Sequence, residues 1–163
     1  GMQRSERSAQ ARRELDRKFN QADLEPIRAT PRSGWIRAVR GALGMSQSVL
    51  ARRLGVSAAA VNKLEQAERR GGITVRKLAE VAAALDCTLV YALVPSTTLE
   101  QTVTTQARRV ATETLGYVAR TMTLESQGIG EEPEREAIDR YAHQLTASGN
   151  VWRAGLEGSS ADA

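Results

Sequence analysis

The stretch from Ser46 to Gln66 places small, apolar and polar side chains at spacings that suit contact with nucleic acid. A serine opens each of two expected helices, and Gly55 lies between them, where a turn with positive φ costs glycine little. Seven positions fit two helices packed closely across such a turn: Gln47, Ala51, Gly55, Val56, Val61, Leu64 and Glu65. The pattern predicts a helix-turn-helix, which presents its second helix to the major groove of DNA. A helical hairpin without that function is the alternative.

This stretch resembles the Cro/cI-type (Xre-like) helix-turn-helix. In that family, a glutamine at the start of the helix before the turn contacts a phosphate, and Gln47 matches it, next to the expected helix cap Ser46. The resemblance also implies base contacts from the outward positions of the helix after the turn: Ser57, Ala58, Ala59, Asn62 and Lys63. Ala58 departs from the glutamine that many relatives carry there.

The chemistry of these side chains limits what they can read. Alanine cannot hydrogen-bond to a base edge, but its methyl group can pack on the methyl group of thymine. Asn62 can pair with adenine, and Lys63 can pair with guanine or a phosphate. Arg52 and Arg53 are expected to contact phosphates, which position a protein without reading sequence. The alternatives are an ordinary exposed helix face for the two arginines and a solvated side chain for Asn62.

A longer resemblance covers residues 10–125. Four stretches carry it: "GWIRAVRGALGMS", "LARRLGVS", "LEQAERRGGITVRKLAEVAAALDCTLVYALVP" and "LEQTVTTQARRVA". Together they resemble mobile mystery protein A, a family with an Xre-like domain that occurs on plasmids and other mobile elements. Members are encoded beside mobile mystery protein B, a Fic-domain protein. The resemblance therefore implies a regulator that is paired with a Fic-domain partner.

The Fic resemblance points to one short motif. Fic enzymes usually transfer AMP from ATP onto protein hydroxyls, and many are inhibited by a helix with Ser/Thr, three residues, Glu, then Gly or Asn. Thr121 and Glu125 match this pattern on one helical face, whereas Ser126 departs from it. In such helices the glutamate pairs with an arginine of the Fic active site, so the resemblance implies that Thr121 and Glu125 inhibit the partner. A solvated glutamate near a helix end is the alternative.

Composition favours an all-α protein that is not an enzyme. Residues 1–70 carry 15 Lys/Arg and 7 Asp/Glu, whereas residues 71–163 carry 8 and 12, so the basic half suits phosphates. His143 is the only histidine and Cys87 the only cysteine, so we expect no metal site, no cofactor and no catalytic triad. The sequence shows neither a secretory signal nor an apolar run of about 20 residues, and a cytoplasmic location is expected.

Breaks in the hydrophobic periodicity divide the chain into four expected segments. They are a basic N-terminal helix and linker (1–33), a helix-turn-helix domain with a trailing strand (34–95), a C-terminal helical region (96–150) and a tail (151–163). In the first segment Ala11, Leu15 and Phe19 recur every four residues, which predicts a helix that packs Leu15 and Phe19 of this narrow stripe on a partner subunit. A basic arm lying along DNA is the alternative.

The stretch "CTLVYALVP" (Cys87–Pro95) predicts the one short β-strand of the otherwise helical fold. Its thiol is expected to be buried, and the long helix that follows is expected to complete a five-helix DNA-binding core. No other strand is evident, and an unpaired apolar strand is prone to unwanted association. We therefore expect it to pair with its copy in a second subunit, giving the two-fold homodimer that most DNA sites of this class require.

Two functions follow from these patterns. The first is a sequence-specific DNA-binding transcriptional regulator that represses its own operon and inhibits a Fic-domain partner, as an antitoxin does. The alternative is a DNA-binding accessory protein of a mobile element without Fic inhibition. An alanine-rich helix suits the alternative because it needs little base specificity.

Overall fold

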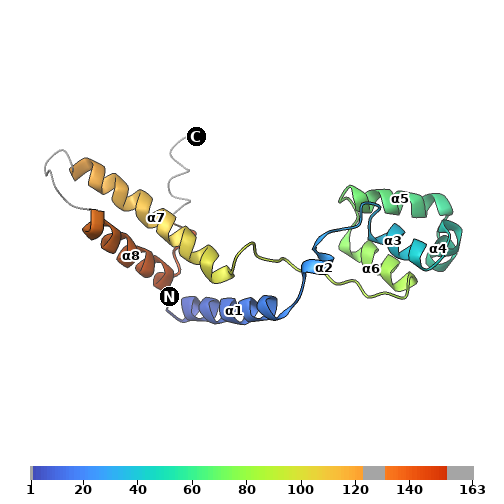
Figure 1. Cartoon of the computed structure of the whole chain (residues 1–163), viewed down its shortest axis with the longest axis horizontal. Coiled ribbons are helices and arrows are strands. Elements are labelled where there is room, and N and C mark those ends of the chain that lie inside the picture. The colour runs from blue at the N-terminus through green and yellow to red at the C-terminus, as the bar shows by residue number, and fades with distance from the viewer. Residues whose placement is uncertain (1, 123–130, 154–163) are drawn as a thin grey trace. The chain divides into compact units, whose positions relative to one another are not determined.

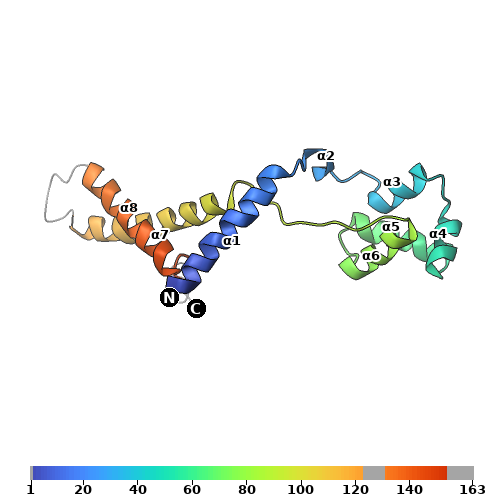
Figure 2. The ribbon, with the colours of Figure 1, turned by 90° about the horizontal axis from the view of Figure 1, so that it is seen from below.

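The computed structural model describes residues 2–122 and 131–153, and within these ranges it consists of eight helices and no strand. The chain divides into two compact units. We call residues 23–93 the inner unit, and residues 1–22 together with 94–163 the terminal unit. Figures 1 and 2 show the helices of both units from two directions. The expected all-helical fold class is thereby confirmed.

The inner unit contains one short helix and four longer ones. They are α2 (Glu25–Arg28), α3 (Trp35–Ala42), α4 (Gln47–Leu54), α5 (Ala58–Arg69) and α6 (Val75–Ala84). The hydroxyls of Ser46, Ser57 and Thr74 accept hydrogen bonds from the backbone N–H three residues later, at 3.2, 3.1 and 3.1 Å. These caps satisfy N–H groups that have no partner inside a helix, and they set the starts of α4, α5 and α6.

The core of the inner unit is built from small and branched aliphatic side chains contributed by α3 to α6 and by Leu85, which follows α6. Its buried members are Ile36, Leu50, Ala51, Val61, Val81 and Leu85. Leu50, Val61 and Val81 are fully buried, and Ala51 is nearly so, which lets α4 lie close against α5. This core holds α4 and α5 as one rigid pair.

The terminal unit brings the first helix of the chain together with the last two. It comprises α1 (Met2–Gln21), α7 (Leu99–Met122) and α8 (Glu131–Ser148). In both views α7 and α8 lie side by side and run in opposite directions (Figures 1 and 2). They enclose a separate core of Ala107, Val110, Ala111, Ile138, Ala142, Leu145 and Val151.

Helix α1 packs on α7 and α8 within the chain, and this contact leaves most of its predicted stripe exposed. Ala11 and Leu15 are exposed, and only Phe19 of that stripe is half-buried. The carboxylate of Asp16 instead accepts hydrogen bonds from the N–H groups of Leu99 and Glu100, at 2.8 and 3.2 Å. The contact of α1 within the chain is therefore partly polar, and the packing of the stripe on a partner subunit stays a prediction.

The expected strand at Cys87–Pro95 is wrong for the single chain. Residues 88–94 have no backbone hydrogen bond to any described part of the chain, and Figure 1 shows the segment between α6 and α7 without regular structure. A strand needs a neighbouring strand to pair with, and no described part of the chain supplies one. The thiol of Cys87 is exposed rather than buried.

The long helix α7 does not complete the inner core as expected. Its buried residues Ala107, Val110 and Ala111 all lie in the core of the terminal unit. Helices α3 to α6 therefore close the inner core without a fifth long helix. None of the helices that the structure describes combines the length and apolar character of a membrane span.

Candidate nucleic-acid interface

The turn between α4 and α5 has the geometry that the sequence predicts. Gly55 ends α4 with φ of +68° and ψ of +32°, in the left-handed region, and its N–H bonds to carbonyls of the last turn. After this turn Val56 donates its N–H to the carbonyl of Ala51 at 2.9 Å. Ser57 then caps α5, so the two helices are joined by only a few residues with fixed backbone.

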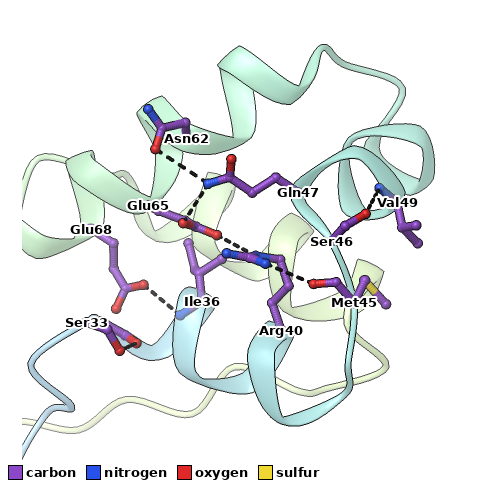
Figure 3. A network of polar contacts seen from close by, with 11 residues as sticks. Ser33, Ile36, Arg40, Met45, Ser46, Gln47, Val49, Asn62, Glu65 and Glu68 are labelled. Atoms are coloured by element: carbon purple, nitrogen blue, oxygen red, sulfur yellow. Dashed lines mark hydrogen bonds and ion pairs between the residues drawn. The ribbon is translucent and has the colours of Figure 1, made fainter.

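A network of polar side chains ties α3, α4 and α5 together below the surface (Figure 3). Its centre is Glu65, which is only 3% exposed. One carboxylate oxygen accepts a hydrogen bond from Nε of Arg40 at 2.6 Å, and the other accepts one from Nε2 of Gln47 at 3.0 Å. Arg40 also donates to the backbone carbonyl of Met45 at 2.9 Å, just before α4 begins. The buried charge is thus paired and hydrogen-bonded on both oxygens, as burial requires.

A second carboxylate, that of Glu68, lies at the other side of the network and caps the start of α3. It accepts the N–H groups of Trp35 and Ile36 at 2.6 and 2.8 Å, which are the first donors of α3. Gly34 precedes them with φ of +83°, and a Cβ placed there would lie 3.1 Å from both carboxylate oxygens. Only glycine therefore combines this backbone angle with this close approach. Through Glu68, α5 also fixes the start of α3.

The predicted base-reading residues lie where they can meet a groove. Ser57, Ala58, Ala59, Asn62 and Lys63 are all exposed. Val61, which follows Ala60, points into the core instead. The outer face of α5 therefore begins with two methyl groups, followed one turn later by an amide and an ammonium group.

Gln47 is placed differently from the simple phosphate contact that the family resemblance implies. Its amide nitrogen donates to Glu65 at 3.0 Å and approaches Oδ1 of Asn62 at 3.4 Å (Figure 3). A phosphate oxygen also needs a donor, and the two hydrogens of this nitrogen are already directed to these partners. Gln47 therefore links α4 to the base-reading face of α5, and a phosphate would have to compete for its N–H groups.

The two arginines of α4 are exposed, but only one has a described partner. Nε of Arg53 donates to the carbonyl of Ala84 at 2.6 Å, which binds the last turn of α6 to α4. Arg52 has no side-chain partner among the described residues. Arg53 thus supports the fold, whereas Arg52 carries a charge that is not engaged within the described chain. The hydroxyl of Ser46 serves as a helix cap.

Sequence reasoning did not single out Arg40 or Glu68. A signal was present for Arg40, because it lies four residues after Ile36 on the apolar face of α3, where a charge needs a buried partner. Glu68 gave no signal, because its contact with α3 spans more than 30 residues and depends on tertiary packing.

The second predicted site, Thr121 and Glu125, lies at and beyond the end of α7. Thr121 lies in the last turn of α7, but its side chain is not described. Glu125 lies outside the described residues altogether. Among the residues that are described, no group of three or more His, Cys, Asp or Glu side chains could hold a metal ion.

Comparison with known proteins supports the assignment made from the geometry. Residues 36–91 match the helix-turn-helix family model. The matched stretch begins in α3 and ends beyond α6. No curated protein and no solved structure matched the chain. The matched part of the inner unit is therefore a helix-turn-helix domain, and it supports a role for the chain as a DNA-binding regulator.

Proposed function

We propose that the chain is a sequence-specific transcriptional regulator that binds double-stranded DNA as a homodimer and represses its own operon. The observation that carries the proposal is the rigid pair of α4 and α5, with Ala58, Ala59, Asn62 and Lys63 exposed on one helix. Such a helix can enter the major groove without rearrangement of the domain.

In this proposal Ala58 and Ala59 contribute to the recognition of the DNA sequence. Because Ala58 and Ala59 are short, the start of α5 can approach the floor of the groove closely. Their methyl groups then suit the methyl group of thymine, while Asn62 suits the paired donor and acceptor of adenine. The proposed half-site therefore contains A·T pairs.

The charge of the inner unit supplies the sequence-independent part of the affinity. This unit carries 11 Lys/Arg and 6 Asp/Glu. Two of the acidic residues, Glu65 and Glu68, are engaged within the unit by Arg40 and by backbone N–H groups. The face around α4 and α5 is left with the exposed cations Arg52 and Lys63, which can replace the counterions of phosphates.

Lys63 and Lys77 provide a matched pair of variants for testing this face. Lys77 lies in α6 and pairs with Glu80 at 3.0 Å on the surface, so Lys77→Ala removes the same charge from another helix. We expect Lys63→Ala to weaken binding to the upstream DNA of the gene by about tenfold, or 1–3 kcal/mol if it contacts a base. Lys77→Ala should change the affinity much less. Gel shifts over a series of salt concentrations measure both effects.

The salt series also distinguishes the kind of contact. If Lys63 meets a phosphate, its loss lowers the slope of log affinity against log salt by about 1 and affects all sequences alike. If Lys63 contacts guanine, its removal lowers the affinity for the specific site more than the affinity for other sequences. Equal DNA affinities of Lys63→Ala and Lys77→Ala would show that Lys63 on α5 does not contact the DNA. Footprinting that shows no protected site upstream would favour the mobile-element accessory protein.

A second activity, inhibition of a Fic-domain partner, is supported by the Thr121 to Glu125 spacing at and beyond the end of α7. In this proposal the carboxylate of Glu125 occupies the arginine that otherwise binds a phosphate of ATP, through a strong charge-assisted pair. The chain would then silence the enzyme and repress the operon at the same time.

Co-expression with the Fic-domain product of a neighbouring gene tests this second activity. Glu125→Gly should release AMP transfer that the unaltered chain suppresses, because ATP regains its phosphate-binding arginine. Glu113→Gly is the control, since Glu113 lies on α7 and its ion pair among the described residues is with Arg109 at 2.9 Å. A silent complex with Glu125→Gly, or no complex at all, would contradict inhibition through this residue while leaving the DNA-binding proposal intact.

A further inference from the structure

Residues 88–94, which we call the apolar segment, expose more large apolar side chains than any other part of the described chain. Val90, Tyr91 and Leu93 are 80%, 71% and 87% exposed, and Val94 is 42% exposed. No charged residue lies between Asp86 and Glu100. Single exposed apolar side chains are ordinary, but a contiguous run of them marks an interaction surface.

The backbone of the apolar segment is also without partners. None of its N–H or C=O groups bonds to another described residue, although the preceding N–H of Cys87 is held by the carbonyl of Ala82 at 2.8 Å. The chain is thus held by a hydrogen bond at Cys87, just after α6, and the segment that follows has unpaired backbone N–H and C=O groups among the described residues. A second extended chain alongside can satisfy the groups that point to one edge of the segment, which are those of every other residue.

The amount of apolar surface suits a protein partner. The four large side chains expose on the order of 500 Å² per copy, compared with the ~800 Å² that each partner of a stable complex buries. Pairing of the backbone adds to this area. The segment therefore supplies the larger part of an ordinary interface.

We propose that the apolar segment pairs with the same segment of a second copy of this chain, as an antiparallel two-stranded ribbon centred on Tyr91. In this register Tyr91 lies opposite Tyr91 of the partner subunit. Leu89 then lies opposite the partner's Leu93, and Val90 lies opposite the partner's Ala92. The pairs formed by residues 89–93 are apolar, and Thr88 lies opposite the partner's Val94 at each end. Cross-strand pairs of aromatic and aliphatic side chains stabilise antiparallel strands.

A second copy is favoured over another partner because the segment is self-complementary. An antiparallel pairing of two identical strands has two-fold symmetry, so each copy offers the other the same set of donors, acceptors and side chains. The absence of charge removes any repulsion between the two copies, which identical charged strands would suffer. The proposal deepens the proposed function, since a dimeric regulator would gain its two-fold axis from this ribbon, but it is tested without DNA.

Cysteine cross-linking tests the register. Cys87→Ser removes the only cysteine of the chain, and Tyr91→Cys is then added. Opposed residues of an antiparallel pair lie about 4.5–5.5 Å apart, within reach of a disulfide. We expect mild oxidation with copper–phenanthroline to join most of the protein into dimers through residue 91.

The control for the register is Leu93→Cys in the same Cys87→Ser background. In the proposed ribbon the two copies of residue 93 lie about 13 Å apart, because each is offset by four residues from the other. This variant should not cross-link by itself, but mixed with Leu89→Cys it should form the mixed dimer. Efficient cross-linking at 93 alone, or none at 91, would overturn the register.

A proline substitution tests the pairing itself. Tyr91→Pro leaves residue 91 without a backbone N–H and prevents a regular strand. Because Tyr91 is mostly exposed, the helical content should be unchanged by circular dichroism. Light scattering should then give the 17.7 kDa mass of a single chain for Tyr91→Pro and twice that for the unaltered protein. A monomeric unaltered protein at tens of micromolar would overturn the proposal, whether or not it binds DNA, and would point to a different protein as the occupant.

Discussion

At the scale of single residues, the inner unit depends on a charge that is removed from water. Glu65 lies between Arg40 and Gln47, and the side chain of Arg40 is itself only 13% exposed. Breaking such a buried pair from one side leaves the other charge without compensation. We therefore expect Glu65→Ala to lower the free energy of unfolding of the inner unit by about 3–5 kcal/mol.

The tryptophans allow this to be measured in the full chain. Trp35 lies in the inner unit and Trp152 in the terminal unit, so Trp152→Phe leaves fluorescence that reports the inner unit alone. In that background, urea unfolding gives the stability of Glu65→Ala and of Lys77→Ala. The Lys77→Ala change removes an exposed ion pair with Glu80, which contributes less than about 1 kcal/mol. Equal stabilities of the two variants would show that the network does not hold the domain together.

At the scale of elements, α7 obtains its N-terminal cap from a distant helix. Thr98 and Gln101 bond to each other's backbone N–H groups at 3.0 and 3.1 Å, and Asp16 of α1 accepts the next two N–H groups. Arg12 of α1 adds an ion pair with Glu100 at 2.8 Å. The N-terminus of α7 is therefore both a capping box and the attachment point of α1.

Asp16→Ala should lower the stability of the terminal unit by about 1–2 kcal/mol, because it removes a cap and a tertiary contact together. Hydrogen exchange should also become faster in α1. Glu14→Ala is the matched control, since Glu14 is exposed on α1 and accepts a hydrogen bond from Gln10 of the same helix. Urea unfolding followed by Trp152 in a Trp35→Phe background measures both variants, and a similar loss in each would argue against the cap.

At the scale of the whole molecule, the two cores share no residue. One contains Ile36, Leu50 and Val81, and the other contains Ala107, Val110 and Ile138. Each unit should therefore unfold as its own cooperative transition. We expect residues 23–93, expressed alone, to fold with a stability within about 0.5 kcal/mol of that in the full chain.

The fragment of residues 23–93 also separates the two proposed activities. It retains α4, α5 and most of the apolar segment, but lacks α7 and everything beyond it. It should bind the upstream DNA and fail to inhibit a Fic-domain partner. Circular dichroism during urea unfolding and gel shifts check these outcomes, and an unfolded fragment would show that the inner unit depends on the terminal one.

The sequence alone determined the local structure of the inner unit and the location of its reading helix. Ser46 and Ser57 predicted two helix starts correctly, and Gly55 predicted the turn, because caps and positive φ angles are decided by neighbours within a few residues. The long helices near residues 99–122 and 131–148 were also predictable, since an apolar face repeats over many turns.

The tertiary structure alone decided which distant groups meet. The pairing of Arg40 with Glu65, the capping of α3 by Glu68 and the attachment of α1 to α7 through Asp16 all join polar groups far apart in sequence. Polar contacts of this kind leave no periodic signal, because one well-placed carboxylate suffices where an apolar interface needs a whole stripe. The segment Cys87–Pro95 has the composition of a strand but no strand neighbour among the described residues, because pairing is a property of two segments and not of one.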